Sequence, residues 1–308
     1  MIGDPVTTGD GVRALVAAEL GQAADPRVTR MAAAIAALHP DAARAVLFYG
    51  SCLRSTELSG QMLDFYLIVS DYAAAYAKRW LGAANRILPP NVFPFTHDGL
   101  AAKYAILSEQ DLTALCGPEA STVSVWARFA QPSRLVWVAD TVAEARVVDA
   151  VARAAPTLFA LTLPTLHAPS PDDPLPIWRA AFALTYHAEL RAERDDRSGS
   201  IVDADPERYR RFGRAVLAEQ PSDTLQRSPS ERSAAQAQWR QLQRRGKWMT
   251  AARLVKASAT FAGGIDYLAW KIHRHAGTGI VIRPWQRRFP LIGALTLLPR
   301  LLRGGAVR

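Results

Sequence analysis

The stretch VLFYGSCLRSTELSGQMLDFYLIV, from Val46 to Val69, decides how this chain folds. An apolar run that predicts a strand is followed by a turn at Gly50-Ser51 and by a second apolar run, Met62 to Val69, which carries one acid, Asp64. Such a continuous apolar run is typical of a strand that is covered on both faces. A carboxylate in that setting is costly to bury unless it is paired, so we expect Asp64 to have a partner.

This order of strand, Gly-Ser turn and acid-bearing strand suits the chemistry of nucleoside triphosphates. Gly50 permits a close approach of the backbone, and Ser51 with the amides of the following turn can hold phosphate oxygens. Asp64, after twelve intervening residues, can hold a magnesium ion that bridges those phosphates. The arrangement resembles the polymerase-beta-like nucleotidyltransferase signature, in which one or two acids follow the Gly-Ser turn. The position of the second acid is Tyr66 here.

Apolar periodicity divides the rest of the first 145 residues into alternating helices and strands. Helices are predicted at Pro26–Leu38 and Tyr72–Ile87. Further strands are predicted at Val92–Phe95, Ala101–Leu107 and Arg134–Val138. This alternation indicates an α/β (α+β) domain, and the signature above makes a nucleotidyltransferase fold the specific expectation.

The pattern becomes helical after Thr141, and a Pro-rich connector lies between Pro164 and Pro176. The sequence beyond Ala234 is basic and amphipathic. We therefore predict three parts: a nucleotidyltransferase domain (residues 1–145), a mostly helical domain (146–238) and a basic amphipathic region that associates with membranes (239–308).

Several blocks between residues 45 and 140 are similar, in the same order, to those of the mitochondrial-type CDP-diacylglycerol synthases. These phosphatidate cytidylyltransferases are also called the translocator assembly and maintenance family, and the chain resembles a bacterial relative. The blocks are Tyr49-Gly50-Ser51, Met62-Leu63-Asp64-Phe65, Pro90-Asn91-Val92-Phe93, Ala102-Lys103-Tyr104-Ala105-Ile106-Leu107-Ser108, and Arg128 with Pro132 and Arg134. The family's His and Asn after the acid-bearing strand have no match between Asp71 and Ala84. The resemblance therefore indicates the reaction class more firmly than the substrate.

The resemblance implies that CTP and phosphatidic acid react to give CDP-diacylglycerol and pyrophosphate. The acceptor is a phosphate monoester whose second pKa is about 6, so it is ionised at neutral pH and needs no carboxylate base. The site needs positive charge instead, because two anionic phosphates must meet. The implied roles are catalysis by Asp64 and Lys103, Mg²⁺ binding by Asp64, and nucleotide or phosphate binding by Tyr49, Gly50, Ser51, Arg54 and Arg128.

The positive charge is concentrated at one end of the chain. Residues 240–308 carry 14 Lys and Arg against the single acid Asp266, whereas the rest carries 23 basic and 27 acidic residues. The uncharged run Phe289–Pro299 would be about 17 Å long as a helix, against a hydrocarbon core of about 30 Å. It cannot span a membrane, but with its flanking arginines it suits the interface of an anionic membrane. The predicted membrane contacts are Trp285, Arg287, Arg288, Phe289, Leu291, Leu295, Leu298 and Arg300.

The sequence favours a peripheral protein on the cytoplasmic face of a bacterial inner membrane, with no transmembrane helix and no nucleic-acid partner. Its two cysteines, Cys52 and Cys116, cannot form a disulfide framework or a four-cysteine zinc site. The first thirty residues show no secretory or transit pattern. The alternatives are an enzyme acting on another lipid phosphate or on RNA, and an inactive membrane-associated scaffold. The leucines between Phe289 and Leu302 disfavour RNA, because a phosphate-binding tail gains little from them.

Overall fold

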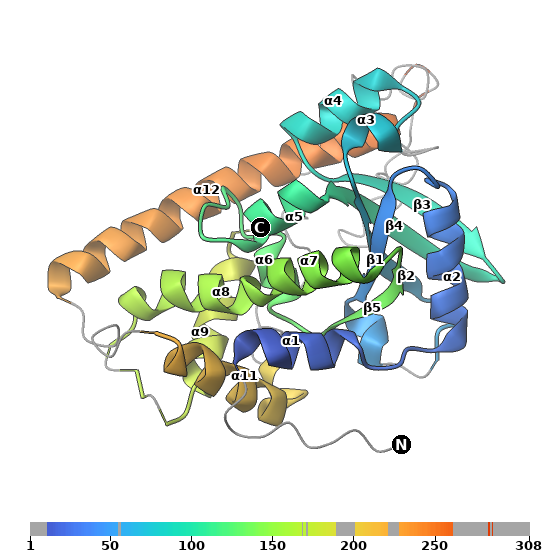
Figure 1. Cartoon of the computed structure of the whole chain (residues 1–308). Coiled ribbons are helices and arrows are strands. Elements are labelled where there is room, and N and C mark those ends of the chain that lie inside the picture. Colours follow the sequence, from blue (N-terminus) through green and yellow to red (C-terminus); the bar gives the residue numbers. More distant parts are fainter. Residues whose placement is uncertain are drawn as a thin grey trace.

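The computed structural model describes residues 11–54, 57–167, 169–170, 172–188, 201–220, 228–260, 283 and 285. A five-stranded sheet in the order β3-β4-β2-β1-β5 lies among helices (Figure 1). The strands are β1 (Ala43–Tyr49), β2 (Met62–Val69), β3 (Asn91–His97), β4 (Leu100–Ser108) and β5 (Ser133–Val138). β2 and β4 are parallel, whereas the other neighbouring strands are antiparallel. The chain therefore has a mixed α/β architecture, and all five predicted strands are present.

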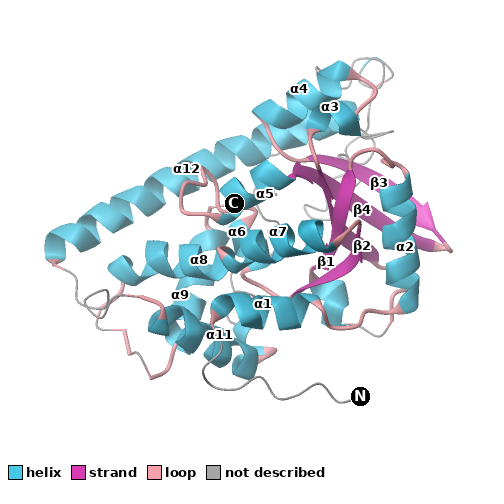
Figure 2. Cartoon of the chain, viewed as in Figure 1, coloured by secondary structure: helices cyan, strands magenta, loops and turns pink. Residues whose placement is uncertain are grey.

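Helices precede the sheet, separate its strands and follow it (Figure 2). Those of the described residues are α1 (Val12–Leu20), α2 (Pro26–Ala37), α3 (Tyr72–Ala75), α4 (Arg79–Ile87), α5 (Glu109–Cys116), α6 (Trp126–Phe129), α7 (Thr141–Ala152), α8 (Ala154–Thr162), α9 (Leu175–Tyr186), α11 (Pro206–Ala218) and α12 (Pro229–Thr260). Short 3-10 helices are η1 (Ser51–Arg54) and η2 (Leu163–Thr165). Asp25, Asp140 and Asp205 begin α2, α7 and α11, because each carboxylate accepts a hydrogen bond from a backbone N–H of the first turn.

The single helix predicted from Tyr72 to Ile87 is wrong, because the chain forms α3 and α4 instead. Tyr76 leaves the helical conformation (φ −124°, ψ 119°). Its hydroxyl then accepts a hydrogen bond of 3.2 Å from Asn85 of α4. Gly82 permits the two helices to touch, since a Cβ there would lie 3.2 Å from the Tyr72 carbonyl oxygen. Burial of Tyr76 and Asn85 outweighs the continuous helical periodicity.

Both faces of the sheet are covered, as the apolar run of β2 predicts. Alternate residues of a strand point to opposite faces. Phe65 and Leu67 pack in one apolar cluster with Met31 and Ile35 of α2. Ile68 belongs to a second cluster, formed with α1, α7 and α8 on the other face.

The second apolar cluster continues across the boundary predicted at residue 145, which falls inside α7. Its buried aromatic side chains include Phe159 of α8, Trp178 of α9, Phe212 of α11 and Trp239 of α12. The described residues between 146 and 220 are mostly helical. Their helices share a core with the sheet, and the division into separate domains stays a prediction.

One apolar helical stretch, Thr141–Thr165, is long enough to cross a membrane by length and composition, among the residues that the structure describes. However, 67% of its apolar window is buried inside the protein. It comprises α7, α8 and η2, which pack in the second cluster. The stretch is therefore no clear transmembrane span.

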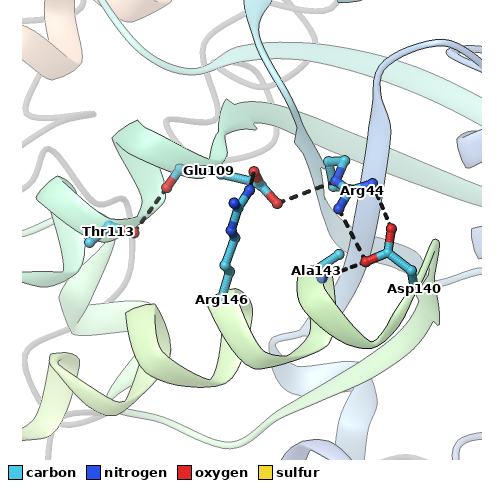
Figure 3. A network of polar contacts seen from close by, with 6 residues as sticks. All are labelled: Arg44, Glu109, Thr113, Asp140, Ala143 and Arg146. Atoms are coloured by element: carbon cyan, nitrogen blue, oxygen red, sulfur yellow. Dashed lines mark hydrogen bonds and ion pairs between the residues drawn. The ribbon is translucent and has the colours of Figure 1, made fainter.

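An ion-pair network holds the beginning of β1 against α5 and α7 (Figure 3). The Arg44 guanidinium donates to both oxygens of Asp140, at 2.9 and 3.1 Å. It also donates to Glu109 at 3.4 Å, and Glu109 accepts from Arg146 at 2.7 Å. Each carboxylate thus has at least two donors. This network lies at the opposite end of β1 from Tyr49 and the Gly-Ser turn.

Candidate active site

Three residues that the sequence singles out lie side by side across the sheet. Tyr49 of β1 is the register partner of Asp64 in β2, and Asp64 is the register partner of Lys103 in β4. Directly opposite residues project from the same face of a sheet. Lys103 Nζ lies 3.1 Å from Asp64 Oδ1. Lys103 is therefore the partner that a carboxylate in this strand needs.

Gly50 follows β1 and touches the same carboxylate. Its φ of +93° is in the left-handed region, which glycine adopts without steric cost. A Cβ on this residue would lie 3.3 Å from Asp64 Oδ2. Both the backbone conformation and the close approach therefore favour glycine after β1.

The Asp64 carboxylate keeps unused hydrogen-bonding capacity. Oδ1 is buried and has no hydrogen-bond donor among the described residues, although it forms the ion pair with Lys103. Lys103 and Asp64 are thus close enough for a salt bridge, but the orientation of the ammonium does not make a hydrogen bond to Oδ1. The side chains of Asp64 and Lys103 remain 23% and 37% exposed. A carboxylate oxygen in this state can accept a donor or a cation that arrives with a ligand.

These residues fit a magnesium ion that is shared with a substrate. Among the described residues, no three His, Cys, Asp or Glu side chains gather to form a metal site. Mg²⁺ is commonly held by one or two carboxylates together with water and substrate phosphates. Asp64, whose Oδ1 accepts no hydrogen bond among the described residues, supplies one such carboxylate. Tyr66, at the position of a second acid, is only 3% exposed and belongs to the apolar core.

An aromatic layer borders the Asp64 site on its core side. The rings of Tyr49 and Tyr66 are 5.1 Å apart, and Phe129 of α6 lies 6.3 and 5.3 Å from them. This packing brings α6 over the strand ends that carry the site. It also puts Arg128, the residue before Phe129, in the helix that borders the site.

Two arginines from distant parts of the chain meet at Ser124. Arg128 donates a hydrogen bond to the Ser124 carbonyl oxygen. Arg253 of α12 donates to the Ser124 hydroxyl at 3.0 Å and to the Pro89 carbonyl oxygen at 2.8 Å. α12 thus contributes a cation beside Ser124, just before α6, which the sequence did not single out.

Lys256 adds a third cation near this position. Its ammonium donates to the carbonyl oxygens of Leu88 and Pro90. Burial and the nearby Arg253 guanidinium lower the pKa of Lys256 to about 7. The only signal in the sequence was the basic composition after residue 240, which does not indicate which cations turn inward.

The other predicted site residues differ in how far the structure describes them. Ser51 is exposed in η1, next to Gly50. Arg54 ends η1, and its side chain lies outside the described part of the chain. Arg134 does not join the site, since it faces the charges of Glu19 and Arg208. Burial raises the pKa of the Cys52 thiol, which disfavours a thiolate beside Asp64.

The predicted membrane segment falls almost wholly outside the described residues. Trp285 is described and is 40% exposed. The other predicted contacts, Arg287, Arg288, Phe289, Leu291, Leu295, Leu298 and Arg300, lie outside the described residues.

No protein-family model matches this chain, and no curated protein is significantly similar to it.

Proposed function

We propose that this protein is a nucleotidyltransferase that makes CDP-diacylglycerol and pyrophosphate from CTP and phosphatidic acid at an anionic membrane surface. One observation carries the proposal: an incompletely bonded carboxylate, Asp64, lies between Lys103 and the Gly50 turn. A nucleotidyltransferase fold is consistent with this order of turn and acid-bearing strand. The choice of CTP and phosphatidic acid rests on the family resemblance.

The proposed reaction is an in-line displacement at the α-phosphorus of CTP. An oxygen of the lipid phosphate attacks, a new P–O bond forms, and the bond to the β-phosphate breaks with release of pyrophosphate. Because the second pKa of a phosphate monoester is about 6, the attacking oxygen already carries negative charge. The site therefore works with one strand carboxylate and no general base.

Positive charge is the main requirement when two phosphates meet. Lys103, at 37% exposure, can turn from Asp64 to a phosphate oxygen. Mg²⁺ held by Asp64 would offset the charge of the triphosphate. Arg128 and Arg253 meet at Ser124 and add to the positive field. An anion near Lys256 would favour its charged form and raise its lowered pKa.

Pyrophosphate release by the purified full-length protein tests this proposal. The assay contains Mg²⁺, one nucleoside triphosphate at a time, and phosphatidic acid dispersed in detergent. We expect release that requires CTP and lipid together and that is lost in Asp64→Ala. Asp149→Asn is the matched control, because Asp149 is an exposed acid paired with Arg13 on the surface.

The other outcomes separate the alternatives. Release with a different lipid phosphate or nucleotide would keep the reaction class and change the substrate. Release that requires RNA, with binding that weakens steeply as salt increases, would indicate a nucleic-acid enzyme. No release with any nucleotide and acceptor would favour an inactive scaffold. Peripheral attachment to the cytoplasmic face of an inner membrane belongs to the same proposal.

A further inference from the structure

The outward face of α4 carries two large apolar side chains. Trp80 is 51% exposed and Ile87 is 82% exposed. They are seven residues apart, and residues at this spacing lie on the same side of a helix. Ala83, between them, is also exposed. Single exposed apolar residues are common, whereas two large ones aligned on one face of a helix can form part of an interaction surface.

Basic side chains border this apolar pair. Lys78, Arg79 and Arg86 are exposed, and none of them has an ion pair within the described part of the chain. Arg79 precedes Trp80, and Arg86 precedes Ile87. α4 itself contains no acid. Its outward face thus combines apolar groups with cations.

The inward face of α4 holds the helix firmly in place. Asn85 is fully buried and donates to the Ile106 carbonyl oxygen of β4 at 2.9 Å. Asn91 of β3 donates to the Leu81 carbonyl oxygen at 3.0 Å. The helix is therefore tied to the sheet on one side, and its apolar residues remain exposed on the other.

We propose that this face of α4 docks on an anionic lipid membrane. Trp80 and Ile87 would lie at the boundary between headgroups and acyl chains, with Arg79 and Arg86 at the lipid phosphates. A surface of this composition is typical of helices that lie in the membrane interface. Anionic lipid complements the three cations, at about 1 kcal/mol per basic residue near the surface.

The position of α4 is consistent with this partner. Lys256, near the end of α12, donates to the Leu88 carbonyl oxygen just after α4. Beyond Thr260 the chain continues into the basic, apolar-containing residues 261–308. The proposal does not depend on the proposed reaction, because it needs no nucleotide.

Sedimentation of the full-length protein with lipid vesicles tests the docking surface. We compare vesicles of neutral phosphatidylcholine with vesicles that also contain phosphatidylglycerol, at low and high salt. Trp80→Ser with Ile87→Ser should weaken binding at least about tenfold. The matched control is Leu38→Ser with Val142→Ser, since Leu38, just after α2, and Val142 of α7 are 51% and 54% exposed.

Charge reversal tests the basic part of the same surface. Arg79→Glu with Arg86→Glu should weaken binding to anionic vesicles about thirtyfold or more at low salt. The loss of binding should be much smaller at high salt, because salt screens exposed charges. The control is Arg211→Glu with Arg214→Glu, which changes two exposed arginines of α11. Equal effects of both charge reversals would indicate attraction by net charge and would overturn the proposal.

Several results would contradict docking through α4. Full vesicle binding by the Trp80 and Ile87 variant would overturn it, as would an absence of binding by the wild-type protein. If light scattering showed that this variant converts a dimer to a monomer, the face would be an interface between copies. Asp64→Ala should keep vesicle binding, whereas the α4 variant should keep activity on water-soluble, short-chain phosphatidic acid. Failure of docking is therefore distinguishable from failure of the proposed reaction.

Discussion

Two ion pairs of this protein differ in how completely their hydrogen bonds are formed. In the core, Arg208 donates to both oxygens of Glu19, at 2.6 and 2.9 Å, and to the Ala130 carbonyl oxygen at 3.0 Å. The two side chains are only 4% and 12% exposed. At the sheet, Lys103 and Asp64 are 3.1 Å apart, and Asp64 Oδ1 lacks a hydrogen-bond donor among the described residues.

This difference separates a structural pair from a candidate site. Arg208 joins α1, α6 and α11 and lies over the Phe212 ring at 4.2 Å. A buried pair of this kind has little left to offer a ligand, and loss of one partner leaves a buried charge. The Asp64 pair is more exposed and retains an acceptor, so a ligand can use it at small structural cost. Incomplete bonding, rather than charge alone, thus distinguishes the candidate site.

Breaking the core pair should have the largest effect on stability. Arg208→Met leaves the Glu19 carboxylate buried without its guanidinium, and we expect a loss of about 3–5 kcal/mol in the free energy of unfolding. Chemical denaturation measures this loss. Arg210→Met is the control on the same helix, since Arg210 pairs at the surface with Glu207, and it should cost less than about 1 kcal/mol. Equal losses in both variants would contradict the distinction between the pairs.

Removing the charge of the site should affect activity instead. Asp64→Asn should lower pyrophosphate release about a hundredfold to a thousandfold, because the site loses the carboxylate that Asp64 contributes from β2. The free energy of unfolding should change by less than about 1 kcal/mol, since the pair is partly exposed and Asp64 Oδ1 accepts no hydrogen bond among the described residues. Denaturation and activity measured on one preparation test both parts. A large loss of stability would show that Asp64, like the pair of Arg208 and Glu19, has mainly a structural role.

Glycine substitutions separate backbone strain from contact with the site. Gly50 and Gly60 both have positive φ, +93° and +69°, but only a Cβ at Gly50 would approach Asp64. Each change to alanine should cost about 1–2 kcal/mol of stability. Only Gly50→Ala should also lower pyrophosphate release, because the new Cβ would lie 3.3 Å from Asp64 Oδ2 and would displace that carboxylate. If both variants lost activity equally, the contact between Gly50 and Asp64 would be unimportant.

Lys256 contributes to the free energy of unfolding in a way that depends on pH. Its pKa in the folded protein, about 7, lies below the ordinary value of 10.5. Between these values the unfolded chain binds more protons, so this lysine makes the protein more stable as pH rises from about 7 towards 10.5. The stability of Lys256→Met relative to wild type should therefore be highest at pH 6.5 and decrease towards pH 9.5. Lys247→Met, an exposed control on α12, should follow the wild-type profile, and parallel profiles for both variants would contradict the lowered pKa.

The local pattern of apolar residues was sufficient to predict most of the sheet. The five strands follow from their apolar runs, and the continuous run of β2 correctly indicated that both faces are covered. The same pattern did not predict the break at Tyr76, where the chain forms α3 and α4 in place of one helix. The hydrogen bond between Tyr76 and Asn85, and the close contact at Gly82, are tertiary features that helical periodicity does not contain.

The sequence by itself determined the parts of the candidate site: a Gly-Ser turn between two strands, and one acid that must be paired because its strand is buried. Only the tertiary structure decided the pairing. Lys103 meets Asp64 because β4 lies parallel to β2 in one particular register. In the same way, α12 brings Arg253 to Ser124, although 128 residues lie between them in the chain. Composition and periodicity describe each segment separately, whereas strand order, register and helix packing depend on contacts between segments far apart in the sequence.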